Sequence, residues 1–281
     1  MKYLRGKNAV ITGSASGIGR ATALEMGREG MNVVIADIHE AGMEETAAQV
    51  RARGVKAAVK KTDVSKKEQV KALIDFAIEE FGGIDVMMNN AGVASFSEMR
   101  DLSLEEDWEW AVGINLWGPI YGCHYVLPHM IQRGAGHIVN ISSAAGILTV
   151  PGGASYCCTK FGVVGMSEVL RSEVARLGIG VTCVCPGIVK TPIAEAIKTR
   201  KLKEIDLSKV LRYWGQKPQK TAVKILHGVR KNKRLLLPTI DAKIVWFLKR
   251  FFPGLYAALG LLAARNFERL RATQEQSPSA V

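Results

Sequence analysis

Tyr156 and Lys160, four residues apart in the stretch SYCCTK, have the types and spacing that suit proton transfer. Residues i and i+4 share one face of a helix, so the two side chains would lie together. A free tyrosine has a pKa near 10, and a neighbouring ammonium group favours the phenolate and lowers that pKa. We therefore expect Lys160 to bring the Tyr156 phenol into the working range of a general acid or base.

Two cysteines between these residues, Cys157 and Cys158, offer a competing thiol chemistry. The chain has five cysteines, an odd number without a CxxC pair, and five histidines that form no cluster with metal-ligand spacing. We expect no secretory leader before the strand-like run that starts near residue 8. We predict a cytoplasmic protein without a metal site, in which the reduced cysteines pack as small core residues.

A glycine-rich turn in ITGSASGIGR is the second chemical feature. Gly13, Gly17 and Gly19 follow a strand-like run and open a helical pattern, with Ser16 and Ile18 in the same turn. A helix N-terminus presents unpaired N–H groups and a positive dipole end to an anion. Because glycines let a pyrophosphate approach this backbone closely, the turn indicates a dinucleotide site.

An acid ends the second strand-like run, MNVVIAD, at Asp37, eighteen residues after Gly19. A carboxylate at this position can accept both hydroxyls of an adenosine ribose. It would repel a 2′-phosphate, since two unit charges about 4 Å apart interact by roughly 4 kcal/mol at an effective dielectric near 20. Neither Ser16 nor Ile38 supplies a cation to reverse this preference, although Arg20 could still touch a phosphate. We therefore expect NAD rather than NADP.

The surrounding elements alternate between two patterns. Short β-branched runs lie at residues 8–13, 31–37, 55–64, 84–92, 136–143 and 178–187, and helical patterns lie at 18–29, 41–53 and 66–80. This alternation predicts an α/β fold, a single doubly wound, Rossmann-type parallel sheet with helices on both faces. The stretch SLEE at 103–106 is typical of a capping box opening the helix that carries Trp108 and Trp110.

Seven motifs in order resemble the short-chain dehydrogenase/reductase family over about residues 5–195. They are TGSASGIG (12–19), Asp63–Val64, NNAG (89–92), Asn115, ISS (141–143), YCCTK (156–160) and PGIVKT (186–191). The resemblance implies hydride transfer between NAD(H) and a secondary alcohol or ketone. In the oxidising direction, the Tyr156 phenolate takes the hydroxyl proton.

The resemblance also implies roles for single residues. Ser143, favoured over Ser142, would hydrogen-bond the substrate oxygen, and Asn115 would order a water that relays protons past Lys160. Lys160 would also hold the nicotinamide ribose. The remaining cofactor contacts would be Asp63 and Val64 at adenine, Asn90, Ala91 and Gly92 along the ribose, and Pro186, Gly187, Val189 and Thr191 near the nicotinamide.

Composition divides the 281 residues into three parts. We assign residues 1–240 to the Rossmann-type catalytic domain, 241–270 to an apolar and basic helical extension, and 271–281 to a disordered tail. The formal charge is +12, of which residues 217–250 contribute +9, with ten basic residues and one acid. The uncharged run at 251–264 is too short for a bilayer, which needs about 20 residues. We therefore expect either peripheral membrane contact, beside the inner face of a membrane, or packing in the core or against another subunit.

Substrate choice is the least constrained prediction. Residues 192–215 are expected to form a helical lid, in which Tyr213 and Trp214 either line the site or pack as ordinary core residues. No Arg or Lys is clearly placed to bind a substrate carboxylate, and Lys190 and Lys198 are the two left open for that role. The apolar extension favours a lipophilic substrate, such as a steroid, a retinoid or a long-chain alcohol. The alternatives are a 3-oxoacyl-carrier-protein reductase using NADPH, which Asp37 disfavours, and a non-catalytic cofactor-binding or scaffold protein.

Partners follow from the same resemblance. Family members commonly form dimers or tetramers through helices that here would hold residues 115–133 and 155–176, so we expect a homodimer or homotetramer. The basic pI suggests nucleic acid, but the chain lacks any matching recognition module, and we expect no nucleic-acid binding.

Overall fold

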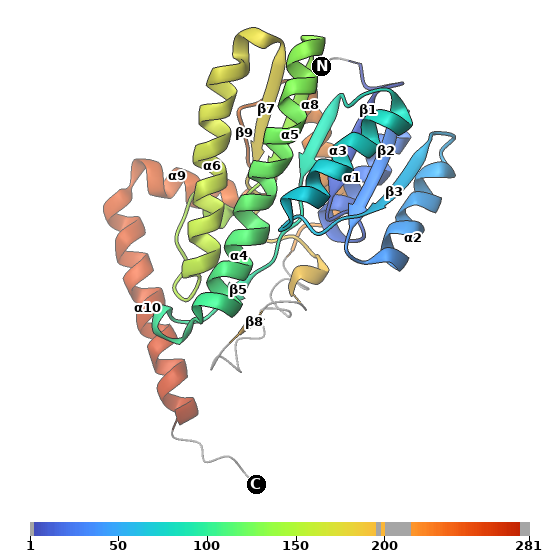
Figure 1. Ribbon diagram of the computed structural model, residues 1–281. Coiled ribbons are helices and arrows are strands. Elements are labelled where there is room, and N and C mark those ends of the chain that lie inside the picture. The colour runs from blue at the N-terminus through green and yellow to red at the C-terminus, as the bar shows by residue number, and fades with distance from the viewer. Residues whose placement is uncertain (1–2, 195–197, 200–214, 276–281) are drawn as a thin grey trace.

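The computed structural model describes residues 3–194, 198–199 and 215–275 (Figure 1). Its centre is a sheet of short strands, namely β1 (Asn8–Thr12), β2 (Asn32–Asp37), β3 (Ala57–Lys61), β4 (Val86–Asn89), β6 (Gly136–Ile141), β7 (Ile179–Val184) and β9 (Leu235–Leu236). Neighbouring strands all run parallel, in the order β3-β2-β1-β4-β6-β7-β9. The predicted doubly wound, Rossmann-type sheet is confirmed.

Helices cover both faces of this sheet (Figure 1). One core layer holds side chains of α1 (Gly17–Arg28), α2 (Glu40–Arg51) and α8 (Pro218–Arg230), and the other holds those of α3 (Lys67–Phe81), α5 (Gly118–Arg133) and α6 (Ala154–Val174). Because both faces are covered, the central strands are apolar along nearly their whole length. The three helices expected in the first half of the chain lie within two residues of their predicted bounds.

The helical stretch after Ser103 contains two π-helical segments, Leu104–Glu109 and Gly113–Trp117, on either side of α4 (Trp110–Val112). Ser103 Oγ accepts from the N–H of Glu106 at 3.2 Å, as the predicted cap requires. The return bond differs from the prediction, because Asp107 rather than Glu106 accepts the N–H of Ser103, at 3.0 Å. A π-helical turn is wider than an α-helical turn. Asp107, four residues after Ser103, therefore lies where Glu106 would lie in a capping box.

Two C-terminal helices, α9 (Ile240–Phe251) and α10 (Pro253–Glu275), stand outside the two helix layers (Figure 1). Helix α10 includes residues 271–275, which the sequence analysis assigned to a disordered tail. The core-packing interpretation of the extension is also wrong, since most large apolar side chains of both helices are exposed.

Among the described residues, no single helix is long and apolar enough to cross a membrane. Only α9 and the first part of α10 meet that criterion together, and these two segments are bent by 118° to each other.

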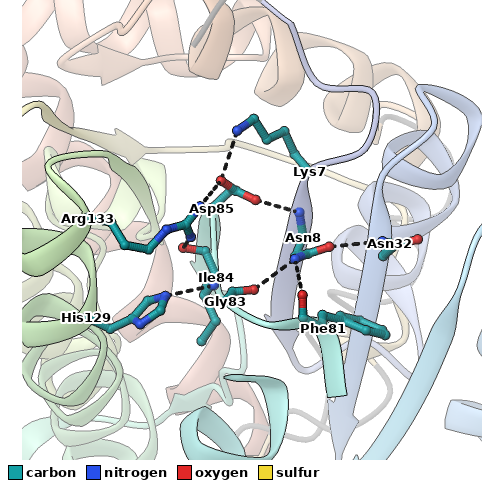
Figure 2. Close-up of polar contacts among 9 residues, drawn as sticks. All are labelled: Lys7, Asn8, Asn32, Phe81, Gly83, Ile84, Asp85, His129 and Arg133. Carbon is teal, nitrogen blue, oxygen red and sulfur yellow. Dashed lines mark hydrogen bonds and ion pairs between the residues drawn. The ribbon is translucent and has the colours of Figure 1, made fainter. Parts of the chain in front are cut away.

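A polar cluster ties the elements together at the edge where the strands begin (Figure 2). Asp85, which is only 5% exposed, binds Lys7 Nζ at 3.2 Å and Arg133 Nη2 at 3.1 Å through Oδ1. Its Oδ2 accepts the N–H of Asn8 at 2.9 Å. Asn8 Nδ2 in turn donates to the carbonyl groups of Phe81 and Gly83. These bonds join the start of β1 to the start of β4 and to α5.

We predict that Asp85→Ala lowers the free energy of unfolding by about 2–3 kcal/mol, because a buried N–H and a guanidinium group lose their partner. Urea unfolding at neutral pH measures this loss. Asp75→Ala is the matched control, since it removes an exposed ion pair with Lys71 that solvent screens. Equal losses in the two variants would contradict the structural role of Asp85.

Candidate active site

The predicted site residues gather at the edge of the sheet where the strands end. Residues 13–19 follow β1, residues 90–92 follow β4, residues 142–143 follow β6, and residues 186–191 follow β7. Parallel strands end along a common edge, and in doubly wound sheets the binding crevice lies outside that edge, where the strand order reverses. Here the order reverses between β1 and β4, so the glycine-rich turn lies beside the crevice.

The glycine-rich turn has a backbone that only glycine fits. Gly13 has φ +66°, and a Cβ there would lie 2.7 Å from the Cα of Ala91. A Cβ on Gly19 would lie 2.1 Å from the carbonyl oxygen of Gly13. Helix α1 starts at Gly17, its N-cap Ser16 makes no side-chain capping bond, and the first N–H groups of a helix have no intrahelical acceptor. The turn therefore fits a dinucleotide pyrophosphate.

Asn90 holds this turn in place. Its side-chain Nδ2 donates to the carbonyl groups of Thr12 at 2.9 Å and Gly13 at 2.8 Å. The hydroxyl of Thr12 accepts the backbone N–H groups of Asn90, at 3.0 Å, and Ala91, at 3.2 Å. The side chain of Asn90, predicted to lie along the ribose, is thus bound to the loop, and Thr12 is a positioning residue that sequence reasoning missed.

Asp37 lies at the end of β2 with most of its acceptor capacity in use. Its Oδ2 accepts the N–H of Ala15 at 2.9 Å, and its Oδ1 accepts those of Ile38 at 2.8 Å and His39 at 3.1 Å. A carboxylate has about four acceptor positions, so about one remains for a ribose hydroxyl. Three backbone donors also fix the orientation of the charge beside the glycine-rich turn.

Arg20, considered as a phosphate ligand, is bound within the protein. Its Nε donates to the carbonyl oxygen of Ala15 at 2.9 Å, and its Nη2 lies 2.9 Å from Glu45 Oε2. The guanidinium charge is therefore paired with Glu45.

The remaining predicted cofactor residues surround the same edge. Asp63 Oδ1 accepts from the backbone and hydroxyl of Ser65, at 2.9 and 2.7 Å, and Val64 is buried where a Cβ on Gly118 would touch it. The side chain of Thr191 lies against Gly17, where an added Cβ would be 3.2 Å from its Cγ2. The loops after β1 and β7 therefore meet across the crevice.

Ser143, Tyr156 and Lys160 lie together. The Ser143 hydroxyl is close enough to the Tyr156 phenol to lower its pKa, and Lys160 Nζ lies over the Tyr156 ring, 5.7 Å from its centroid. Lys160 Nζ also donates to the carbonyl oxygen of Ile141 at 3.2 Å. Ser142 differs from Ser143, because its buried hydroxyl donates to the carbonyl oxygen of Lys160 at 2.8 Å and serves to hold α6.

Burial, rather than Lys160, controls the acidity of Tyr156. The pKa of Tyr156 is raised from 10.0 mainly because protein atoms exclude water from the phenol, and the Ser143 hydrogen bond offsets this only in part. Burial also lowers the pKa of Lys160 to about 8, which reduces the positive charge that it offers. The predicted lowering of the Tyr156 pKa is therefore wrong for the protein alone.

Asn115 lies in the second π-helical segment and is completely buried. Its Oδ1 accepts the N–H of Val93 at 2.8 Å, and its Nδ2 donates to the carbonyl oxygen of Val93 at 2.9 Å. A Cβ on Gly92 would lie 3.2 Å from Asn115 Oδ1 and 3.3 Å from Lys160 Nζ, so both side chains border this glycine. The predicted proton relay remains a prediction, with its two protein groups close together.

The cysteines between Tyr156 and Lys160 turn away from the chemistry. Cys157 is buried and Cys158 is exposed on other faces of α6, and Cys123, Cys183 and Cys185 are buried as well. Burial raises the pKa of the Cys157 thiol, which disfavours a thiolate nucleophile. In the part of the chain that the structure describes, no three Cys, His, Asp or Glu side chains form a metal-binding group.

On the substrate side, Phe96 in β5 (Ser95–Phe96) lies beside Tyr156, with ring centroids 5.7 Å apart. Lys198, in β8 (Lys198–Thr199), places its ammonium 4.0 Å from the ring centroid of Trp110 and donates to the carbonyl oxygen of Glu106 at 3.2 Å. Most of the predicted lid, including Tyr213 and Trp214, lies outside the described residues.

The C-terminal extension, together with Thr239 just before it, holds the site from two sides, which sequence reasoning missed. Thr239 Oγ1 accepts the N–H of Gly187 and Asp241 Oδ2 accepts the N–H of Ile188, both at 2.9 Å. The one available signal was that Asp241 is the only acid between Lys217 and Arg250. These bonds fix the loop predicted to meet the nicotinamide.

The second contact is with the loop between Ser143 and Tyr156. Lys249 Nζ donates to the carbonyl oxygen of Ile147 at 2.8 Å, and the Tyr256 hydroxyl accepts the N–H of Thr149 at 2.7 Å. We call the contacts of Lys249 and Tyr256 with this loop the C-terminal brace. Since the loop connects two predicted catalytic residues, the brace helps to set their separation.

Comparisons with known proteins agree with this geometry. Residues 7–202 match the family model described as short chain dehydrogenase. SadH of Mycobacterium tuberculosis, an oxidoreductase by name, is 35% identical over 274 residues, which cover 95% of this chain and 98% of SadH. The 3-oxoacyl-[acyl-carrier-protein] reductase FabG of Thermotoga maritima is 34% identical over 223 residues, which cover 79% of this chain and 90% of FabG.

Among solved structures, a short chain dehydrogenase/reductase from Burkholderia phymatum in complex with NAD matches with a TM-score of 0.83. The two sequences are 31% identical, and the match covers 91% of this chain and 96% of that chain.

We predict that Tyr256→Phe speeds amide exchange in residues 144–153 by about fivefold or more, because the hydrogen bonds of this hydroxyl to Thr149, each of about 1 kcal/mol, are lost from the brace. Hydrogen–deuterium exchange with mass spectrometry measures this change. Tyr125→Phe, a hydroxyl deletion on α5, is the matched control and should leave the loop unchanged. Identical exchange in wild type and Tyr256→Phe would refute the brace.

Proposed function

The chain belongs to the short-chain dehydrogenase family, and we propose that it transfers a hydride between NAD(H) and a lipophilic secondary alcohol or ketone. Family membership makes it an oxidoreductase. The choice of NAD(H) and of a lipophilic alcohol or ketone is our proposal. The observation that supports this proposal is that Ser143, Tyr156 and Lys160 lie together at the edge where the strands end. The same edge carries the glycine-rich turn, in which Gly13 and Gly19 leave no space for a Cβ.

The proposed chemistry divides between cofactor and protein. When bound, NAD⁺ supplies the carbon that accepts the hydride. Tyr156, as phenolate, takes the hydroxyl proton of the alcohol, and as phenol returns it to a ketone oxygen. Ser143 donates a hydrogen bond to the same oxygen and orients it towards Tyr156. Lys160, with a pKa of about 8, exchanges protons near neutral pH and passes them towards Asn115.

The preference for NAD rests on charge. Asp37 is held by three backbone donors beside the glycine-rich turn, and the nearby Arg20 is paired with Glu45. A 2′-phosphate would meet an oriented negative charge without a free arginine from this neighbourhood. The Burkholderia phymatum structure, which contains NAD, supports the same choice.

A lipophilic substrate is favoured by the apolar neighbours of the acid–base group. Phe96 lies against Tyr156, and exposed leucine and phenylalanine side chains cover the extension whose Tyr256 touches the Thr149 loop. The carrier-protein reductase alternative is weaker, because the match to FabG leaves about a fifth of this chain uncovered whereas the match to SadH covers 95%.

We predict that Tyr156→Phe abolishes turnover and leaves NAD binding unchanged, because the phenol oxygen moves the proton and does not hold the adenosine half. Stopped-flow or steady-state absorbance of NADH measures turnover, and calorimetric titration measures NAD binding. Activity near that of wild type in this variant would contradict the assignment of Tyr156 as the acid–base group.

The raised pKa of Tyr156 also predicts a pH profile. Oxidation needs the phenolate, whose fraction grows as pH rises towards that pKa, so oxidation should accelerate between pH 7 and about pH 9.5. Ketone reduction needs the phenol and should slow over the same range. Rates with a substrate whose chemical step is limiting provide the test, and an oxidation rate independent of pH would argue against a tyrosine base.

We predict that Asp37→Asn lowers the ratio of kcat/KM for NAD over NADP at least tenfold, because charge repulsion is removed while the side-chain shape is kept. Asp63→Asn is the matched control, since that carboxylate is predicted at the adenine and not at the ribose. A similar change in both variants would show that the effect is general electrostatics and not selection at the ribose.

A further inference from the structure

The outer surface of α9 and α10 carries two apolar stripes. On α9, Ile240, Ile244, Phe247 and Phe251 recur at i, i+4, i+7 and i+11, which places them on one helix face. Their exposed fractions lie between 52% and 73%. On α10, Leu255, Leu259 and Leu262 repeat the pattern at i, i+4 and i+7 and are about half exposed. Soluble monomers rarely expose so many large apolar side chains together.

The opposite faces of these helices are already in contact with the protein. On α9, Ala242 is fully buried and Lys249 lies 4.7 Å from the ring centroid of Phe161. On α10, Tyr256 is bonded to Thr149. The helices therefore cannot rotate to bury the stripes without breaking the brace. The outward orientation is built into the fold.

Basic side chains flank the stripe on α9. Lys243 lies three residues after Ile240 and Arg250 lies three residues after Phe247, to one side of the apolar face, and both are exposed. Between α8, β9 and α9 lies a groove of about 850 Å³. Its walls combine apolar side chains with a set of basic ones, namely Lys224, His227, Lys233 and Lys243.

The groove is a region of positive potential. The pKa of Lys224 is lowered, first by burial and then by the charges of Lys243 and Lys220. Its ammonium is held by the side chain of Gln216 at 2.9 Å and by the carbonyl oxygen of Pro238. Such a site, lined by both apolar and cationic side chains, matches an anionic headgroup attached to an acyl chain.

We propose that α9 and the first turns of α10 lie in the interface of an anionic membrane, with the groove between α8 and α9 receiving an anionic lipid headgroup. The two helices, bent relative to each other, lie along the membrane surface. Their phenylalanine and leucine stripes lie at the boundary between headgroups and acyl chains. The basic side chains contact phosphate groups beside them.

Charge favours a membrane over a second copy of the chain. A two-fold contact through this face would set Lys243 and Arg250 of one copy near the same residues of the other, and like charges across an interface are unfavourable. The strongest basic window of the sequence, with a net charge of +9 over residues 217–250, flanks this face. An anionic leaflet attracts the same charges that repel a copy.

This inference stands apart from the proposed reaction, because vesicle binding is measured without turnover. We expect the full chain to sediment with vesicles of phosphatidylcholine containing about one-third phosphatidylglycerol, and to stay largely in solution with phosphatidylcholine alone. Binding should weaken at 0.5 M salt, where charges are screened, and a blue shift of tryptophan emission should report the burial of Trp246. Equal binding to both vesicle types would overturn the headgroup assignment.

Matched variants separate the apolar and charged contributions. Phe247→Glu should abolish sedimentation with anionic vesicles, whereas Leu177→Glu, at an exposed leucine beyond α6 and away from the extension, should not. Lys243→Gln with Arg250→Gln should weaken partition by about fivefold for each charge removed. Circular dichroism and thermal melts confirm that each variant is folded.

Two further results would overturn the proposal. One is unchanged vesicle binding by folded Phe247→Glu. The other is a failure of the wild-type chain to bind anionic vesicles while Phe247→Glu converts an oligomer into a monomer in analytical ultracentrifugation. The second result would assign the stripes to a contact between copies of the chain.

Discussion

Parallel hydrogen bonding of the strands is the constraint on which the rest of this molecule depends. The register that pairs Ile11 with Met88 brings the end of β1 beside the end of β4, and only then can Asn90 bind the carbonyl groups of Thr12 and Gly13. At the opposite edge, Asp85 fixes the start of the same two strands (Figure 2). A slip of one residue would invert the faces of a strand and carry the site residues apart.

Local patterns were sufficient to predict most of the fold. The β-branched runs and the helical patterns between them identify the sheet, because a parallel sheet covered on both faces demands apolar strands separated by helices. The glycine-rich turn was equally readable, since Gly13 and Gly19 occupy positions where any Cβ would clash with backbone. Tyr156 and Lys160 could be paired from the helix period alone.

Effects that depend on distant neighbours could not be predicted in the same way. The raised pKa of Tyr156 comes from burial by several elements, which the spacing of two residues does not report. The helix containing Asn115 is π-helical, a local widening for which the sequence carries no clear signal. The C-terminal brace joins residues more than a hundred positions apart, so no periodicity links Tyr256 to Thr149.

The brace also sets the order in which the site can be completed during synthesis. Lys249 and Tyr256 are made 102 and 107 residues after the loop positions that they hold. At about 5–20 residues per second, the ribosome needs roughly 5–20 seconds to cover that distance. For most of this interval the nascent chain already contains Ser143, Tyr156 and Lys160 but not the contacts that fix their loop. The loop between the proposed catalytic residues is therefore fixed late in the biogenesis of this protein, after those residues have all been synthesised.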